Sequence, residues 1–544
     1  MRVTLVRCPW WVRYCPPYIL AFFASLLRSR GHEVKVLDIN NILYHRAPEN
    51  LRKFWDDRDS YSVWEDPAFV ERISAPEVSG DIVSEVLSND PETVCFTTHT
   101  PNALFSQRLA SRLKKESPST VTLFMGHKCS RTQMAFDFIE KPYIDYVCTG
   151  EADAVLPGLL EKLEKSGSKD LPEHKGFLLR KYGRVLDGGA PDYISDIDSL
   201  PFPDYSDFEG DIKTGSYSMP GRLDILDSRG CVNSCHFCYE RLYWGRYRAM
   251  SGERLFSQIR DHRKRFPGVD FFYFNGLLLN GSPGRLERFC DLVIENGEPI
   301  RWAGQAAVGK NLTGKLLEKM SRAGCSWLGY GVESGSDRVL REMNKKHTVA
   351  DALRVLKDTK RAGISVQINV MFGYPTETRE DFSATLDFLR IARPFIDSVL
   401  ASQSFCTLEK KTFLKENPER FGISESSHHL YWKSLDGQNN YAERFRRYEE
   451  FCREALTLGI PETSGVLSKK PDKWGLIGDY YFYEKDYEKA AESYERSILE
   501  EAETKTVYNK LARVYRLMGE KKRSDACELK AGSMRDPFRE AIRG

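Results

Sequence analysis

Residues 231–239 read CVNSCHFCY, and this stretch decides how the rest of the chain is interpreted. It follows an apolar run at 223–226 that is typical of a buried strand, and Gly230 opens the loop that carries it. Three cysteines within eight residues can turn three thiolates toward one soft metal centre. We therefore interpret Cys231, Cys235 and Cys238 as metal ligands rather than as partners in a disulfide.

Two plainer interpretations of the three cysteines are a structural zinc site and ordinary buried thiols. A closed zinc site needs four protein ligands, and no second cysteine pair follows nearby. His236 lies inside the loop, where it would need an awkward geometry to serve as a fourth ligand. Three ligands on a cubic iron–sulfur cluster instead leave one iron open to bind another molecule.

With the aromatic Phe237 before the last cysteine, the C-x3-C-x2-C motif resembles the signature of the radical S-adenosylmethionine (SAM) enzymes. The resemblance implies a [4Fe-4S] cluster whose open iron chelates the amino and carboxylate groups of SAM. It also implies cleavage of SAM to a 5′-deoxyadenosyl radical, which removes a hydrogen atom from the substrate. We therefore expect an enzyme, and we assign no catalytic residue beyond the cluster.

Residues 222–405 predict the partial (βα)6 barrel that this family uses. Strand patterns recur at 223–226, 271–274, 300–304, 327–332, 364–371 and 398–401, separated by helical patterns such as 311–323 and 349–362. In barrels of parallel strands the chemistry takes place at the carboxyl ends of the strands. The cluster loop lies at such an end.

A carboxylate flanked by glycines, Glu333, ends the fourth expected strand and can accept hydrogen bonds from a ribose diol. A plain turn is the alternative. Glu333 resembles the ribose-binding acid of the family, and residues 373–378, GYPTET, resemble the motif that borders the adenine. Asn275 stands where related enzymes often carry aspartate. The resemblance implies a SAM site made of Phe237, Tyr239, Asn275, Glu333, Ser334, Asn369 and Gly373.

Residues 1–170 predict an α/β fold of the doubly wound, Rossmann-like kind. Strand patterns occur at 3–6, 34–37, 94–98, 121–125 and 143–148, with helical patterns between and after them, among them 102–115 and 154–165. Short apolar strands joined by helices form parallel sheets, which bind ligands beyond the carboxyl ends of their strands.

Ahead of a radical SAM core, this region resembles a cobalamin-binding domain, on the stretches 16–21, 30–34 and 147–151. The Asp-x-His-x-x-Gly loop of many cobalamin proteins is absent, which implies cobalamin bound with its own base displaced. The usual Gly-Gly turn is replaced by Gly126-His127. The expected cobalamin contacts are Trp10, Thr97, Thr98, Gly126, His127, Gly150 and Glu151. Hydrogen-bonded loop positions are the alternative for His99 and His127, and a core position for Trp10 or Trp11.

Five cysteines of this region raise a second possibility, an additional cluster as in the methylthiotransferases: Cys8, Cys15, Cys95, Cys129 and Cys148. Cys95 and Cys148 sit inside expected strands, where cysteine usually acts as a small buried hydrophobic residue. We favour the buried interpretation.

The remaining segments predict a linker, a cap and helical repeats. Residues 171–221 form the linker, with a hairpin at 176–183 and a proline-bounded segment at 200–205 that resembles the connector between cobalamin and radical SAM domains. Residues 406–470 form a substrate cap, in which His428, His429 and Trp432 are substrate contacts or else solvated or core residues. Residues 471–544 resemble tetratricopeptide repeats, with similar Asp/Glu-centred turns 34 residues apart.

Composition is compatible with a globular enzyme of more than one domain. The chain has 544 residues, of which 41% are hydrophobic, and a net charge of +2, so charge suggests neither a nucleic-acid nor a membrane-surface partner. Thirteen unevenly spaced cysteines fit a reducing compartment. The apolar run at 18–27 resembles a signal peptide but lacks a small-residue cleavage site, and no run is long enough to span a membrane. We expect a cytoplasmic protein.

The combined pattern predicts methylation of an unactivated carbon by a cobalamin-dependent radical SAM enzyme. The alternatives are radical cyclisation or rearrangement, a methylthiotransferase-like reaction, and a non-catalytic scaffold that binds a partner through its repeats. The expected partners are a small-molecule, lipid or peptide substrate and a one-electron reductant such as flavodoxin or ferredoxin.

Overall fold

The computed structural model describes residues 1–56, 63–129, 133–167, 170–402, 405–463, 473–500 and 503–534. Parts of the expected cap (464–470) and repeats (471, 472, 501, 502 and 535–544) lie outside the described residues. The chain divides into two compact units. Unit 1 comprises residues 1–232, 240–305 and 319–326, and unit 2 comprises 233–239, 306–318 and 327–544.

Unit 1 begins with a seven-stranded sheet of order β2-β1-β3-β4-β5-β6-β7. Its strands are β1 (Arg2–Val6), β2 (Glu33–Leu37), β3 (Thr93–Thr97), β4 (Val121–Met125), β5 (Tyr146–Cys148), β6 (Phe177–Lys181) and β7 (Arg184–Asp187). The first five strands pair in parallel, and the expected hairpin adds β6 and β7 in antiparallel fashion. The expected doubly wound sheet is confirmed.

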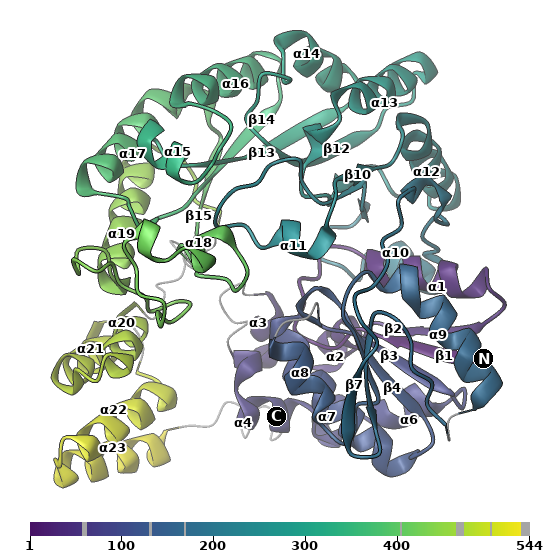
Figure 1. The fold of residues 1–544 in the computed structure, drawn as a ribbon, viewed down its shortest axis with the longest axis horizontal. Helices are drawn as coiled ribbons and strands as arrows, with labels where there is room; N and C mark the ends of the chain where they lie inside the picture. Colours follow the sequence, from purple (N-terminus) through teal and green to yellow (C-terminus); the bar gives the residue numbers. More distant parts are fainter. Residues whose placement is uncertain are drawn as a thin grey trace. The chain divides into compact units, whose positions relative to one another are not determined.

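Helices cover both faces of this sheet (Figure 1). α1 (Tyr18–Arg28) contacts α9 (Ala152–Ser166) on one face, whereas α4 (Pro67–Ile73) and α6 (Ile82–Leu87) contact α7 (Ala103–Glu116) on the other. The apolar run that resembles a signal peptide is α1, and it buries seven side chains. The other helices of this part are α2 (Ile39–Arg46), α3 (Glu49–Asp56), α5 (Pro76–Ser79), α8 (Gln133–Ile139) and α10 (Glu209–Thr214).

The second large sheet has the order β15-β14-β13-β12-β11-β8. Unit 1 contributes β8 (Arg222–Ile225), β11 (Phe271–Phe274) and all but the last residue of β12 (Arg301–Ala306), which pair in parallel. Its other elements are β9 (Ser228–Arg229), α11 (Glu240–Trp244), β10 (Arg248–Ala249), α12 (Gly252–Arg265) and α13 (Pro283–Asn296). These elements follow the strand–helix alternation of the predicted partial barrel.

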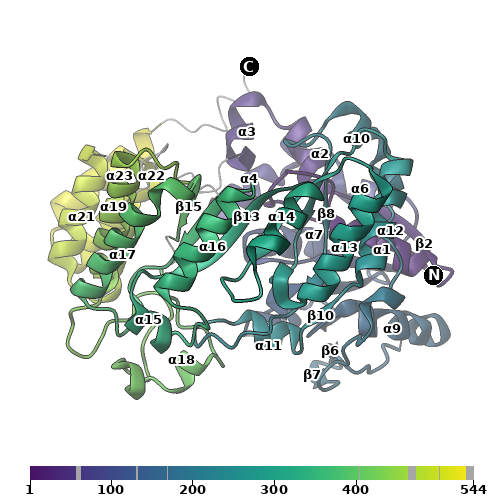
Figure 2. The ribbon, with the colours of Figure 1, turned by 90° about the horizontal axis from the view of Figure 1, so that it is seen from above.

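Unit 2 contributes all but the first two residues of β13 (Cys325–Glu333), together with β14 (Ser365–Val370) and β15 (Ser398–Ala401), again in parallel pairs. The segment 460–463 runs beside β15, where Val399 N donates to Pro461 O at 2.9 Å and Thr463 N donates to Val399 O at 2.8 Å. Figure 2 shows α17 beside α19. The helices are α14 (Gly314–Arg322), shared with unit 1, α15 (Asp337–Glu342), α16 (Val349–Arg361), α17 (Arg379–Ala392), α18 (Phe413–Glu416) and α19 (Tyr441–Thr457).

Four further helices of unit 2 form two antiparallel pairs: α20 (Lys473–Tyr483), α21 (Tyr487–Glu500), α22 (Lys505–Leu517) and α23 (Lys521–Ser533). Gly478 lets α20 approach α21, because a methyl group there would lie 2.5 Å from the Tyr494 ring. Tyr480 of α20 packs against Tyr431 and Tyr441. Within the described residues, no helix combines the length and the apolar character needed to cross a membrane.

Candidate functional site

The cluster loop, residues 230–239, leaves β9 through a glycine that the backbone requires. Gly230 has φ +76°, and a Cβ at this position would lie 2.9 Å from Arg246 O. The loop has no regular hydrogen-bonded structure, and all three cysteine side chains in it are half-buried. Cys231 belongs to unit 1, and Cys235 and Cys238 belong to unit 2.

Contacts within unit 2 fix the second half of the cluster loop. His236 N donates to Met343 O at 3.0 Å, and the imidazole Nδ1 lies 2.7 Å from Glu342 O. The His236 ring stacks on Phe413 with centroids 4.3 Å apart, and Asn344 Nδ2 donates to Ser234 O at 2.7 Å. Because its Nδ1 faces a carbonyl and its ring is stacked, His236 serves the fold of the loop.

The donor set of the loop fits an iron–sulfur cluster. Within the part of the chain that the structure describes, none of the thirteen cysteines forms a disulfide. Within the described ranges, no group of three or more His, Cys, Asp or Glu side chains gathers closely enough to hold a single metal ion. A cubic cluster does not require such a group, because each thiolate bonds a different iron. Three partly exposed thiols on one irregular loop suit it.

A carboxylate and an ammonium meet at the end of β13 in unit 2. Glu333 adopts φ +69°, at an irregularity in the pairing with β14. Lys345 Nζ donates to Glu333 Oε1 at 3.1 Å and to Gly331 O at 2.9 Å. Burial alone lowers the pKa of Lys345, but the Glu333 carboxylate and the nearby Cys235 thiol more than offset this effect, so the pKa is raised. Lys345 was not predicted from the sequence.

The motif at 373–378 forms a loop that is held by hydrogen bonds to buried side chains. Glu377 Oε2 accepts from Gly373 N at 2.8 Å and from Arg447 Nη1 at 2.7 Å, and burial raises the pKa of this carboxyl group. Gly373 has φ +68°, and a Cβ there would lie 2.2 Å from Arg444 Cγ. Asn439 Nδ2 donates to Tyr374 O at 2.9 Å. Three buried polar side chains, Glu377, Asn439 and Arg447, therefore hold the loop.

The other residues predicted to bind SAM differ in their accessibility. Asn369 is half-buried and accepts from Gln367 Nε2 at 3.2 Å. Ser334 is fully buried, and its hydroxyl accepts from Ser336 N at 3.1 Å, so this side chain supports the turn. Phe237 packs against the hydrophobic core of unit 2, whereas Tyr239 is half-buried.

In unit 1, Asn275 follows β11 and lines a cavity. The next residue is fixed by a buried carboxylate, because Gly276 N donates to Asp227 Oδ1 at 3.0 Å. Arg285 holds Asp227 through a contact of 2.7 Å. Asp227 was also not predicted, since nothing in the local sequence distinguishes it from a strand-end aspartate.

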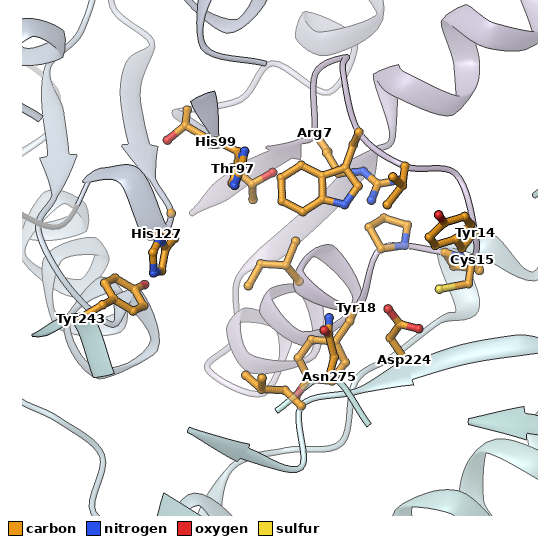
Figure 3. A pocket seen from close by; sticks show the side chains of 18 of the residues that line it. Arg7, Tyr14, Cys15, Tyr18, Thr97, His99, His127, Asp224, Tyr243 and Asn275 are labelled. Carbon is orange, nitrogen blue, oxygen red and sulfur yellow. The ribbon is translucent and has the colours of Figure 1, made fainter. Parts of the chain in front are cut away.

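The cavity of unit 1 has a volume of about 350 Å³ (Figure 3). Its walls come from the carboxyl ends of β3 and β4, from the segment between β1 and α1, and from β8 and α11. His127 and Tyr243 lie on one side of it, and Arg7, Cys15 and Asp224 on the other. Four of the seven expected cobalamin contacts line it: Thr97, Thr98, Gly126 and His127.

Close packing shapes the β4 side of this cavity. Gly126 has φ +137°, and a Cβ there would lie 2.3 Å from Thr98 O. His127 Nε2 contacts Glu240 Oε2 at 3.0 Å, and its ring packs 4.5 Å from that of Tyr243. The histidine that replaces the usual glycine thus lies against α11 and leaves the cavity open.

The other three expected contacts lie outside the lining. Trp10 Nε1 donates to Trp55 O at 3.2 Å, and its neighbour Trp11 lines the cavity instead. A Cβ on Gly150 would lie 2.1 Å from the Pro191 ring. Glu151 is 2% exposed and forms ion pairs with two arginines.

The cysteines considered for a second cluster are buried. Cys95, Cys129 and Cys148 have no exposed surface, and burial raises the pKa of Cys95 and of Cys129 to about 12. Such thiols are poor metal ligands, because a ligand must be a thiolate. Trp432 of the expected cap is also a core residue, with Nε1 donating to Cys406 O at 2.7 Å.

The chain is similar to known proteins in sequence and in fold. The sequence model of the radical SAM superfamily matches residues 225–389. An uncharacterized methyltransferase of Pyrococcus horikoshii is 25% identical over 376 residues, which are 69% of this chain and 73% of that protein. An anaerobic magnesium-protoporphyrin IX monomethyl ester cyclase of Cereibacter sphaeroides is 25% identical over 316 residues, 57% of this chain and 51% of that protein.

Solved structures of low identity share the fold. The cobalamin-dependent SAM radical enzyme OxsB, with aqua-cobalamin and SAM bound, aligns with a TM-score of 0.62 and 15% identity, over 100% of this chain and 83% of that chain. The radical SAM methyltransferase TsrM of Kitasatospora setae, with cobalamin and a [4Fe-4S] cluster bound, aligns with a TM-score of 0.59 and 16% identity, over 82% and 85%. The chain is therefore an enzyme whose residues 225–389 form a radical SAM domain, which works with a [4Fe-4S] cluster and SAM, within the fold that OxsB and TsrM share.

Proposed function

We propose that the protein is a cobalamin-dependent radical SAM enzyme that methylates an unactivated carbon of its substrate. The cavity of unit 1 carries the proposal, because one wall is the ligand-binding edge of the doubly wound sheet and another includes Leu226, Tyr243 and Asn275, which lie within the residues matched by the radical SAM model. OxsB and TsrM, which share the fold, are described with cobalamin bound.

The lining of the cavity fits cobalamin chemically. Trp11, Ile19 and Leu226 present flat or apolar surface for a macrocycle, and the imidazoles of His99 and His127 lie at its edge. Its volume is smaller than a whole cobalamin, so the proposal requires that part of the cofactor extend beyond it. When bound, the cluster and SAM supply a 5′-deoxyadenosyl radical and cobalamin supplies a methyl group.

The chain's own residues then hold and orient these groups. Cys231, Cys235 and Cys238 bind the cluster, and Glu333 accepts hydrogen bonds from the ribose hydroxyls of SAM. Lys345 fixes the Glu333 carboxylate through its 3.1 Å contact. We assign Asn275, Asn369 and Gly373 to the same SAM site, with Phe237 and Tyr239 beside the cluster and Ser334 supporting the turn.

We further propose the domain boundaries given above, with 1–170 binding cobalamin, 171–221 connecting, 222–405 generating the radical, 406–470 covering the substrate and 471–544 docked as repeats. The reductant would be a flavodoxin or ferredoxin in the cytoplasm. The cyclase relative supports one alternative, a radical cyclisation or rearrangement without methyl transfer.

The deciding experiment is anaerobic reconstitution with iron, sulfide and hydroxocobalamin, followed by metal analysis and SAM turnover under dithionite. The proposal expects about four irons and one cobalt per chain, with both deoxyadenosine and S-adenosylhomocysteine formed. Cys235→Ala should lose iron. Ile19→Trp, which fills the cavity, should lose cobalt and keep iron. Iron and deoxyadenosine without cobalt in the wild-type protein would reject methyl transfer and favour the alternative.

A further inference from the structure

Four charged side chains form a buried network in unit 1, between the end of β5 and the start of the cluster loop. This Glu151 network consists of Glu151, Asp153, Arg229 and Arg248, and between 1% and 9% of each side chain is exposed. Its two carboxylates and two guanidinium groups balance in charge.

Glu151 is the centre of the network. Its Oε2 accepts hydrogen bonds from Arg229 Nη1 at 2.6 Å and from Arg248 Nη1 at 3.0 Å, and its Oε1 accepts from Arg248 Nη2. Asp153 Oδ2 pairs with Arg229 Nη2 at 2.7 Å. Because both Glu151 oxygens are engaged and the side chain does not line the cavity, its carboxylate faces the protein and not a ligand.

The two arginines lie on the paired strands that enclose the cluster loop: Arg229 is on β9, which leads into the loop, and Arg248 is on β10, which follows the loop and α11. Arg229 pairs with Arg248 across β9 and β10, and it lies two residues before Cys231. Gly230, between them, is held at φ +76° against Arg246 O. Glu151 occupies the N-cap position of α9, three residues after β5, and its side chain forms no capping hydrogen bond. The network thus joins the loop after β5 to the residue that sets the direction of the cluster loop.

Removing four charges from water is expensive, and buried ion pairs are weak sources of net stability. Such a network is more effective at fixing geometry, because each bond restricts both partners. We propose that Glu151 is a positioning residue for the cluster: through Arg229 it fixes where the chain enters the loop, and hence where Cys231 is presented. The inference rests on the radical SAM domain and is independent of cobalamin, and it replaces the expectation that Glu151 contacts cobalamin.

Hydrogen exchange of the metal-free protein tests the positioning role directly. Glu151→Gln keeps the shape of the side chain and removes its charge, and we expect amides at 228–232 to exchange at least tenfold faster. The matched control is Asp145→Asn, which neutralises a buried carboxylate before β5 that accepts from Thr122 N at 2.8 Å and pairs with Lys114. The control should leave exchange at 228–232 unchanged.

The reconstituted enzyme gives a second readout. In Glu151→Gln, we expect an altered electron paramagnetic resonance spectrum of the reduced cluster and about tenfold weaker SAM binding, with cobalt content unchanged. Glu151→Asp, which keeps the negative charge, should show a spectrum and a SAM affinity between those of Glu151→Gln and the wild type. Wild-type exchange and spectrum in Glu151→Gln would overturn the proposal. If Glu151→Gln does not fold, Arg248→Gln takes its place. Wild-type amide hydrogen exchange at 228–232 in Arg248→Gln would then overturn the proposal.

Discussion

The buried pair of Arg7 and Asp38 offers a sharp test of how the N-terminal sheet is stabilised. Arg7 follows β1 and lines the cavity, and Asp38 caps α2. Only 4% of each side chain is exposed. Arg7 Nε and Nη2 donate to the two oxygens of Asp38 at 3.0 Å and 2.7 Å, and Tyr217 OH donates to Asp38 Oδ2 at 3.0 Å. We consider the change Asp38→Asn.

The expected cost follows from the charge that remains. Each hydrogen bond to a charged group contributes about 1.5–3 kcal/mol, so the two bonds to Arg7 account for about 3–6 kcal/mol. Breaking a buried pair from one side typically costs about 3–5 kcal/mol, because an uncompensated charge remains. At roughly 2 °C per kcal/mol for a unit of this size, the melting temperature of unit 1 should fall by about 6–10 °C.

Differential scanning calorimetry measures this change, with Asp90→Asn as the control, because the Arg2–Asp90 pair is exposed and should contribute less than about 1 kcal/mol. The double variant Arg7→Met/Asp38→Leu should be much less destabilised than the sum of the single variants, since it leaves neither charge unpaired. Additive single and double effects, or a shift below about 2 °C in Asp38→Asn, would refute the reasoning.

Three further predictions follow from individual side chains. Gly373→Ala should weaken SAM binding more than tenfold in a titration of the reconstituted enzyme, because its methyl group would lie 2.2 Å from Arg444. The control Gly297→Ala, at a glycine with a similar φ and no neighbouring atoms within 4 Å, should leave SAM binding unchanged. Burial raises the pKa of Asp381, but hydrogen bonds from neighbouring side chains outweigh it and hold the pKa at about 2, below the ordinary 3.8. The ionised Asp381 should therefore stabilise the wild type by about 2 kcal/mol relative to Asp381→Asn above pH 4. This difference in stability should disappear as the pH falls from about 4 to about 2, and thermal unfolding of both proteins at a series of pH values measures it. Gly478→Ala should loosen α20 from α21 and speed proteolysis between residues 473 and 500, and an unchanged cleavage rate would contradict the packing seen there.

The sequence predicted most of the strands, because each buries apolar side chains over a short run and ends at a turn. The pattern at 34–37 is β2, and the pattern at 121–125 is β4. The fifth strand is the exception, since it was expected from residue 143 and begins at Tyr146. Pro142 and Tyr143 form a turn instead, and the pairing with β4 begins only at Tyr146.

The candidate site was predictable where its chemistry is concentrated in a short motif, as at 231–238 and 373–378. It was not predictable where a partner is distant in the chain. Lys345 lies twelve residues beyond Glu333, and Arg229 is 78 residues from Glu151, so no local spacing marks either pair. Glu151 was expected to face a ligand because it ends a strand, yet the structure turns it toward two arginines. Position at a strand end identifies the right edge of a sheet but not the direction of a side chain.

The segment 460–463 has a consequence for how the protein behaves in concentrated solution. An edge strand whose backbone N–H and C=O groups are unpaired can form hydrogen bonds with a strand of another chain, and proteins commonly cover or interrupt such edge strands. Here the outward-facing N–H of Val399 on β15 donates to the carbonyl of Pro461, and its outward-facing carbonyl accepts from the N–H of Thr463. A variant truncated before residue 460 would expose these backbone groups of Val399. Its self-association should rise with concentration, whereas that of the 544-residue chain should not.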